Sequence, residues 1–184
     1  MEFGKILTVP RAQPGLEPMR LDLTELQLAE SRTKELAYVN KETAQELMYM
    51  FNHAYAKVHE MLVSVRYEFE QAQTYAARRK AIVLLDIAPN ILKEKGLLSS
   101  RSPAGSEDLR QSVLDIDAEY FDYQQKINAL KALYQYLQGK TEALERNYYA
   151  AKKSLDQDRS IGNVNNFHDE DSKELAKMIG NPRI

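Results

Sequence analysis

Apolar side chains recur at alternating steps of three and four residues along two long stretches of this chain. The first stretch runs from Ala44 to Val83, and the second runs from Leu109 to Leu155. A repeat of 3.5 residues that persists beyond three or four heptads is typical of coiled coils. Neither proline nor glycine interrupts residues 41–88. The pattern therefore predicts two long α-helices, each with one apolar seam.

The residues between the two stretches predict how the helices connect. Pro89 is expected to end the first helix, because the residue before a proline avoids the α conformation. Residues 89–105 are rich in Pro, Gly and Ser and are predicted to form a turn, after which Ser106 is suited to cap the second helix. Two helices of similar length joined by a short connection pack antiparallel. We therefore predict an all-α fold in which residues 41–158 form a long antiparallel helical hairpin with coiled-coil character.

The two ends of the chain differ from this hairpin. Residues 1–40 carry three prolines within "VPRAQPGLEP", which excludes a regular helix there. We predict a partly extended N-terminal arm with a short helix between Leu21 and Val39. Residues 159–184 are predicted to form an acidic C-terminal tail that contains a loop and a short helix.

Two helices alone share too little surface to bury all the tyrosines and leucines of the second stretch. The hairpin is therefore predicted to form oligomers through the apolar seam of its second helix. The residues expected at that surface are Tyr120, Tyr123, Ile127, Leu130, Tyr134, Leu137, Leu144 and Tyr148.

Composition narrows the class of protein further. The chain has 25 Lys and Arg against 27 Asp and Glu, so a role in binding nucleic acid would depend on local clusters of cations. It has no cysteine, no signal-peptide pattern near Met1 and no apolar run of the roughly 20 residues that span a bilayer. We expect a cytoplasmic protein that does not bind membranes.

Motifs for catalysis or cofactor binding are missing from the sequence. Neither a nucleophile elbow nor a glycine-rich phosphate loop occurs. Asp115, Glu119 and Asp122 share one helical face and could gather a divalent cation, but a solvated flank that pairs with the first helix is the more common role for such residues. We expect a protein without enzymatic activity, cofactor or metal.

The exception to the apolar seam is a triplet of cations, Arg78, Arg79 and Lys80. Arg79 falls on the seam, where antiparallel packing places it near Asp115, so it could form an interhelical ion pair or bind DNA. Its two neighbours point to the flanks, since successive residues of a helix are about 100° apart. Seven cations gather in the triplet and on both sides of the predicted turn, where the acidic residues are Asp86, Glu94, Glu107 and Asp108. Candidate nucleic-acid-binding residues are Arg78, Arg79, Lys80, Lys93, Lys95, Arg101 and Arg110, with Tyr75 as a stacking ring.

Two segments resemble the long helices of the phage recombination mediator family (UvsY-like). They are "HAYAKVHEMLVSVRYEFEQAQTYAARRKAIVL" and "SEDLRQSVLDIDAEYFDYQQKINALKALYQYLQGKTEALERNYYAAKKSL", and the resemblance covers roughly residues 50–155. It rests on the basic, alanine-rich end of the first helix, on the opening Ser-Glu of the second, and on the acidic spot at Ile116-Asp117. The chain departs from the family in its third adjacent cation, its proline-rich arm and its acidic tail.

The resemblance implies a helical oligomer that binds single-stranded DNA and helps a phage recombinase displace single-strand-binding protein during recombination and repair. It implies that DNA contacts come from the region of Arg78, Arg79 and Lys80, and that the protein works in the host cytoplasm. The alternative is a structural coiled-coil protein of phage assembly, or a scaffold, that binds no nucleic acid.

Overall fold

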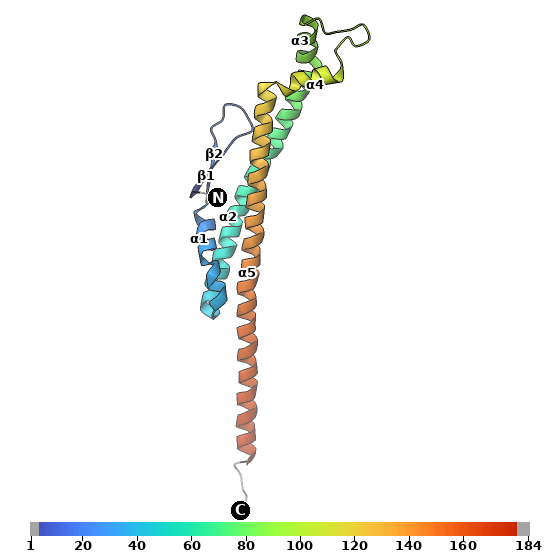
Figure 1. The fold of residues 1–184 in the computed structure, drawn as a ribbon. Coiled ribbons are helices and arrows are strands. Elements are labelled where there is room, and N and C mark those ends of the chain that lie inside the picture. The colour runs from blue at the N-terminus through green and yellow to red at the C-terminus, as the bar shows by residue number, and fades with distance from the viewer. Residues whose placement is uncertain (1–3, 180–184) are drawn as a thin grey trace, which may run out of the picture. The chain divides into compact units, whose positions relative to one another are not determined.

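The computed structural model describes residues 4–179, with side chains up to Asp156. It is mostly helical, as predicted, and its long helices pack against one another. Two strands that the sequence analysis did not predict precede the helices. In chain order the elements are β1 (Ile6–Val9), β2 (Met19–Asp22), α1 (Thr24–Arg32), the 3-10 helix η1 (Thr33–Tyr38), α2 (Lys41–Ile82), the π-helix η2 (Val83–Ile87), α3 (Ala88–Glu94), α4 (Glu107–Asp115) and α5 (Ala118–Ile179) (Figure 1).

The chain divides into two compact units. The first comprises residues 1–24 and 58–140, and the second comprises residues 25–57 and 141–184, so α2 and α5 contribute to both. None of the helices among the described residues is long and apolar enough to cross a membrane.

In the first unit, α2 and α5 run antiparallel. The ring of Tyr75 on α2 stacks on that of Tyr123 on α5, with centroids 5.9 Å apart and planes 13° from parallel. Buried side chains recur every seven residues, as a coiled-coil seam requires. They are Val58, Val65 and Ala72 on α2, and Tyr123, Leu130 and Leu137 on α5. The predicted hairpin with coiled-coil character is therefore confirmed in this unit.

Pro89 does not end the first helix, which is the first correction to the sequence prediction. Helical structure continues through η2 and α3, so that 54 consecutive residues from Lys41 to Glu94 are helical. The amide of Ala88 donates to the carbonyl of Val83 across a wide π turn. A proline ring ordinarily clashes with the carbonyl four residues earlier, and the wider turn together with the place of Pro89 in the first turn of α3 makes room for it.

The turn that was predicted at residues 89–105 lies instead between Glu94 and Glu107. Gly96, at a φ of 67°, ends α3, and the amides of Gly96 and Leu97 donate to the carbonyls of Lys93 and Leu92. This pair of hydrogen bonds defines a Schellman motif, which favours glycine at its left-handed position. The connection is therefore short and begins at a defined helix end.

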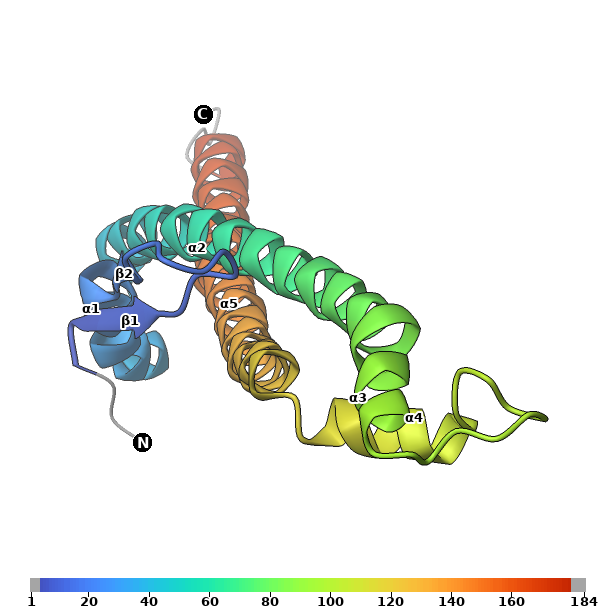
Figure 2. The same ribbon diagram turned by 90° about the horizontal axis from the view of Figure 1, so that it is seen from above.

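The second predicted helix forms in two pieces. Ser106 caps α4 as expected, since its Oγ accepts a hydrogen bond from the amide of Leu109 at 3.4 Å. The helix then breaks after Asp115, and Asp117 caps α5 by accepting from the amide of Tyr120 at 2.8 Å. α4 turns away from the direction of α5 at this break and packs on α3 and η2 (Figure 2). Beyond Ser160, where a loop was predicted, α5 continues as one helix to Ile179.

The N-terminal arm is a small antiparallel hairpin that lies beside α2 in the first unit (Figure 1). Its register pairs Ile6 with Asp22. Glu68 of α2 is 4% exposed and holds the loop between the strands: its Oε2 accepts from the amide of Ala12 at 2.8 Å, and its Oε1 lies 2.7 Å from Nε of Arg11. A buried carboxylate is stable only when it is paired in this way.

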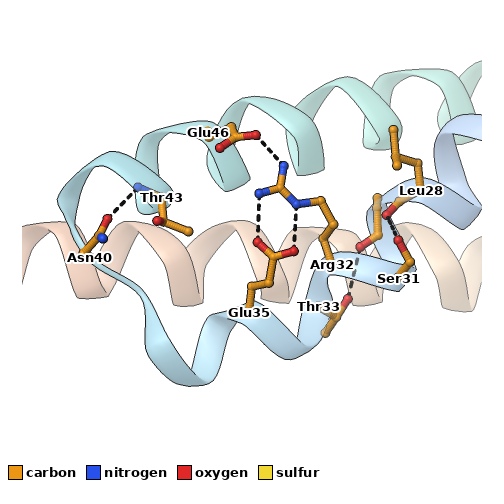
Figure 3. A network of polar contacts seen from close by, with 9 residues as sticks. Leu28, Ser31, Arg32, Thr33, Glu35, Asn40, Thr43 and Glu46 are labelled. Atoms are coloured by element: carbon orange, nitrogen blue, oxygen red, sulfur yellow. Dashed lines mark hydrogen bonds and ion pairs between the residues drawn. The ribbon is translucent and has the colours of Figure 1, made fainter.

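In the second unit, α1 and η1 are tied to the start of α2 by polar contacts (Figure 3). Arg32 donates two hydrogen bonds to Glu35, at 2.8 and 2.9 Å, and a third to Glu46 of α2. These bonds hold the pKa of Glu35 and of Glu46 below the usual value for a glutamate. Asn40 caps α2, because its Oδ1 accepts from the amide of Thr43 at 2.8 Å.

Candidate nucleic-acid interface

Arg79 joins the two long helices at the end of the first unit. Its Nε and Nη2 donate to the two carboxylate oxygens of Asp117 at 3.0 and 2.7 Å, and its Nη1 lies 2.8 Å from Oε2 of Glu119. The side chain is only 23% exposed. The interhelical ion pair expected for Arg79 is therefore present, but its partner lies two residues beyond the expected Asp115. Asp115 pairs with Gln111 instead, because its Oδ1 accepts a hydrogen bond from the Gln111 side-chain amide at 2.8 Å.

The same pair shapes the electrostatics of the break before α5. The hydrogen bonds from Arg79 hold the pKa of Asp117 below its usual value, and the bond from the amide of Tyr120 acts in the same direction. Asp117 thus serves at once as the partner of Arg79 and as the cap of α5. All three nitrogens of the Arg79 guanidinium are engaged within the chain.

Arg78 and Lys80 lie on opposite flanks of the seam. Both side chains are exposed, and neither has an ion pair with any residue that the structure describes. Each lines a groove between α2 and α5. The groove of Arg78 has a volume of about 240 Å³ and is lined by Tyr75, Arg78, Arg79, Ile82, Glu119 and Tyr123. The groove of Lys80 has a volume of about 320 Å³ and is lined by Gln73, Ala76, Ala77, Lys80, Tyr120, Gln124 and Ile127.

The aromatic rings of the two grooves differ in what they can offer a ligand. Tyr75 is half-buried, and one of its faces is covered by the ring of Tyr123. Burial raises the pKa of the Tyr123 hydroxyl. Tyr120 also lines a groove, beside Lys80, although the sequence analysis placed it at an oligomer surface. The amides of Gln73 and Gln124 in the same groove carried no signal in the sequence.

The other predicted cations are spread over three further segments of the first unit. Lys93 and Lys95 lie at the end of α3 and Arg101 in the following turn, and all three are exposed without an ion pair among the described residues. Arg110 of α4 is half-buried, and its Nε is buried without a hydrogen-bond partner in the part of the chain that the structure describes. The structure therefore brings Tyr75 together with Arg78 and Arg79 in one groove, places Lys80 in the other groove, and leaves the remaining cations elsewhere in the first unit.

Cations do not outnumber acidic residues in the region that holds the triplet and the turn. Between Arg78 and Glu119 the chain has seven cations and seven acidic residues. Asp115, Asp117 and Glu119 are acidic residues of this region in addition to the four named above. Two of these three neutralise Arg79. Any affinity for phosphates in this region depends on the exposed, unpaired Arg78 and Lys80 rather than on net charge.

The residues predicted for oligomerisation fall into two groups. Tyr123, Leu130, Leu137 and Leu144 are at most 4% exposed within a single chain, so they have no surface left for a second copy. Tyr120, Ile127, Tyr134 and Tyr148 are half-buried. For the four buried residues, the predicted oligomer surface is instead a seam within the chain, because the period of a seam does not reveal which helix covers it.

The three carboxylates considered for a divalent cation are used separately. Glu119 pairs with Arg79, Asp122 pairs with Lys126 at 2.9 Å, and Asp115 accepts from Gln111. Within the described range, no three histidine, aspartate or glutamate side chains are arranged to hold a metal.

Fold and site together define a class: an antiparallel helical hairpin with a coiled-coil seam, an N-terminal β-hairpin and a cation on each flank of the seam. Comparison with known proteins adds no closer relation, because no protein-family model, curated protein or solved structure matches the chain.

Proposed function

We propose that this protein is a non-catalytic accessory protein of phage recombination and repair that binds single-stranded DNA and assists the loading of a recombinase. The observation that carries the proposal is the placement of Arg78 and Lys80, which are exposed, unpaired among the described residues and set in grooves on the two flanks of the seam. The resemblance to the recombination mediators points to the same residues.

The chemistry of the two grooves suits a single strand. Lysine binds a phosphate as a mobile point charge and arginine binds it as a planar fork, and Lys80 and Arg78 supply one of each kind. Tyr120 lies beside Lys80, where its ring can contact a base without regard to sequence. Arg79 acts on this site only by fixing α2 against α5, so we assign it a positioning role.

The proposal includes partners that the same resemblance implies. Single-stranded DNA, a recombinase and single-strand-binding protein would meet on a homo-oligomer of this chain in the host cytoplasm. Such an oligomer would have to form through residues other than Tyr123, Leu130, Leu137 and Leu144, which are already buried.

The second candidate function is a structural coiled-coil protein of phage assembly, or a scaffold. It is favoured by the equal numbers of cations and acids between Arg78 and Glu119 and by the full engagement of Arg79 within the chain. This candidate predicts no affinity for oligonucleotides even at low salt.

The experiment that separates the two candidates is a salt series of binding to a fluorescent oligo-dT strand, measured by anisotropy between about 50 and 300 mM salt. We expect the parent to bind and the Arg78→Ala, Lys80→Ala double variant to bind more weakly. Its log–log salt slope should be shallower by about 1.4, since each phosphate contact to a single strand contributes about 0.7. Folding should be unaffected, because alanine is the better helix former.

The matched control is the Arg66→Ala, Lys131→Ala double variant, which removes one arginine from α2 and one lysine from α5 in the same unit but outside both grooves. It should bind like the parent. Equal affinity and slope for the parent and the Arg78, Lys80 double variant would overturn the proposed site, and absence of binding by the parent would favour the structural candidate.

A further inference from the structure

The second unit contains a pocket of about 270 Å³ that the proposed DNA site does not use. α2 supplies two of its side chains and α5 supplies four. The lining residues are Asn52, Tyr55, Leu144, Glu145, Tyr148 and Tyr149. None of these six residues is cationic, and one carries a carboxylate.

Three tyrosines give the pocket its aromatic walls. Tyr148 and Tyr149 are neighbours on α5, with ring centroids 5.5 Å apart and planes at 78°. The edge of one of these rings is turned toward the face of the other, both residues line the pocket, and Tyr55 adds a third ring from α2. Ring faces carry the negative part of the aromatic quadrupole, so they attract cations. Leu144, which is 2% exposed, adds an apolar side chain to the lining.

Glu145 supplies a charge beside the rings. It lies three and four residues before Tyr148 and Tyr149, the spacing that places side chains on one face of a helix. It is exposed, and it has no ion pair with any side chain that the structure describes. Asn52 adds a neutral amide from the other helix. The pocket therefore combines aromatic faces with an available carboxylate.

We infer that this pocket binds an arginine side chain presented by a partner protein. A planar guanidinium can stack on a tyrosine ring while its N–H groups donate in parallel to the two oxygens of Glu145. A lysine ammonium is also attracted to the ring faces and to Glu145, but as a point charge it can neither stack flat on a ring nor donate in parallel to both carboxylate oxygens. Charge complementarity thus selects a basic partner, and ring geometry selects arginine. The inference is independent of the proposed DNA site, which belongs to the first unit.

The test uses three blocked pentapeptides of the form Gly-Gly-X-Gly-Gly, in which X is arginine, lysine or citrulline. Citrulline keeps the shape of arginine without its charge. Binding to the full chain is followed by NMR titration of the tyrosine ring signals. We expect the arginine peptide to bind, the lysine peptide to bind at least threefold more weakly, and the citrulline peptide to cause no saturable shift.

Variants locate the binding site within the second unit. Glu145→Gln and Tyr149→Ala should each weaken the arginine peptide by about fivefold or more, as loss of a charge partner or of a cation–π wall does. Both residues are exposed, so helicity measured by circular dichroism should match the parent. The matched controls are Glu142→Gln and Tyr49→Ala, exposed residues of the same unit that do not line the pocket, and these should bind like the parent.

Four outcomes would overturn the inference. They are absence of saturable binding of the arginine peptide, equal binding of the citrulline peptide, equal binding of the lysine peptide, and unchanged affinity in both pocket variants. The Arg78→Ala, Lys80→Ala variant should bind the arginine peptide like the parent. A loss of peptide binding in the pocket variants with DNA binding intact would separate this inference from the proposed function.

Discussion

Replacement of Asp117 by alanine should be the most destabilising change at the surface of the first unit. Asp117 accepts two hydrogen bonds from Arg79, at 2.7 and 3.0 Å, and one from the amide of Tyr120 at 2.8 Å. Its side chain is 12% exposed, so little water replaces these partners when the side chain is removed. The substitution thus unties α2 from α5 and uncaps α5 in one step.

The expected cost follows from these contacts. Hydrogen bonds between charged groups in a partly buried site contribute about 1.5–3 kcal/mol, and loss of a helix N-cap costs about 1 kcal/mol. Glu119 lies 2.8 Å from Arg79 and retains part of the charge pairing. We therefore expect the free energy of unfolding to fall by about 2–4 kcal/mol.

The assay is urea unfolding at pH 7, followed by circular dichroism at the helix band. Asp117→Asn separates the two contributions, since asparagine caps helices as well as aspartate but carries no charge. Asp122→Ala is the matched control, because Asp122 is 57% exposed and pairs only with Lys126 one turn away. The control should cost less than about 0.5 kcal/mol. An Asp117→Ala variant as stable as the control would refute this account of the helix break.

The dependence on pH has a defined sign. The pKa of Asp117 is lowered in the folded protein, so its pairing contributes in full above the unfolded pKa of about 3.9 and is lost as the pH falls through the folded pKa. The difference in stability between the parent and Asp117→Asn should therefore be constant from about pH 7 to pH 5 and shrink below about pH 4. A difference that grows as the pH falls would contradict this sign.

Three further predictions concern the seam, the arm and the second unit. Leu130→Asp places a charge at a fully buried position and should lower the free energy of unfolding by several kcal/mol. The control is Lys131→Asp at the next residue, which is exposed, and it should leave the midpoint of urea unfolding nearly unchanged. Glu68→Ala removes the partner of Arg11 and of the Ala12 amide, so trypsin should cleave the N-terminal arm several times faster. The control is Glu70→Ala, which breaks an exposed ion pair with Arg66 and should not change the cleavage rate. Arg32→Ala frees Glu35 and Glu46, whose pKa values should rise toward the ordinary glutamate range in an NMR titration; unchanged values would show that Arg32 does not set them.

The seam of the hairpin was predictable because coiled-coil packing imposes a period on the sequence. Val58, Val65 and Ala72 lie seven residues apart in the first apolar stretch, as Leu130 and Leu137 do in the second, and all five are buried. The heptad pattern predicted the wrong buried residue near the start of the second stretch. Ile116 falls on the predicted seam but is 79% exposed, because α4 is a separate helix that buries Leu114 instead.

Two features escaped prediction, one because it depends on residues far apart in the sequence and the other because it depends on an unusual helical turn. Glu68 reads as a flank residue beside the apolar Phe69, yet it is the buried one, since the N-terminal arm brings Arg11 and the Ala12 amide to it. Pro89 reads as a helix stop, and only the π turn before it makes the continued helix possible. The rules for local sequence include neither the distant partner nor the altered turn.

The three adjacent cations of the triplet have different surroundings although they belong to one turn of α2. Successive residues of α2 point about 100° apart, so three adjacent cations must enter three environments. Arg79 enters the seam, where Asp117 and Glu119 use its three nitrogens. Arg78 lines one groove between α2 and α5, and Lys80 lines the other. A basic residue on an apolar seam is thus consistent with an apolar core, because its charge is matched within the chain, whereas its two neighbours are exposed on the flanks of the seam.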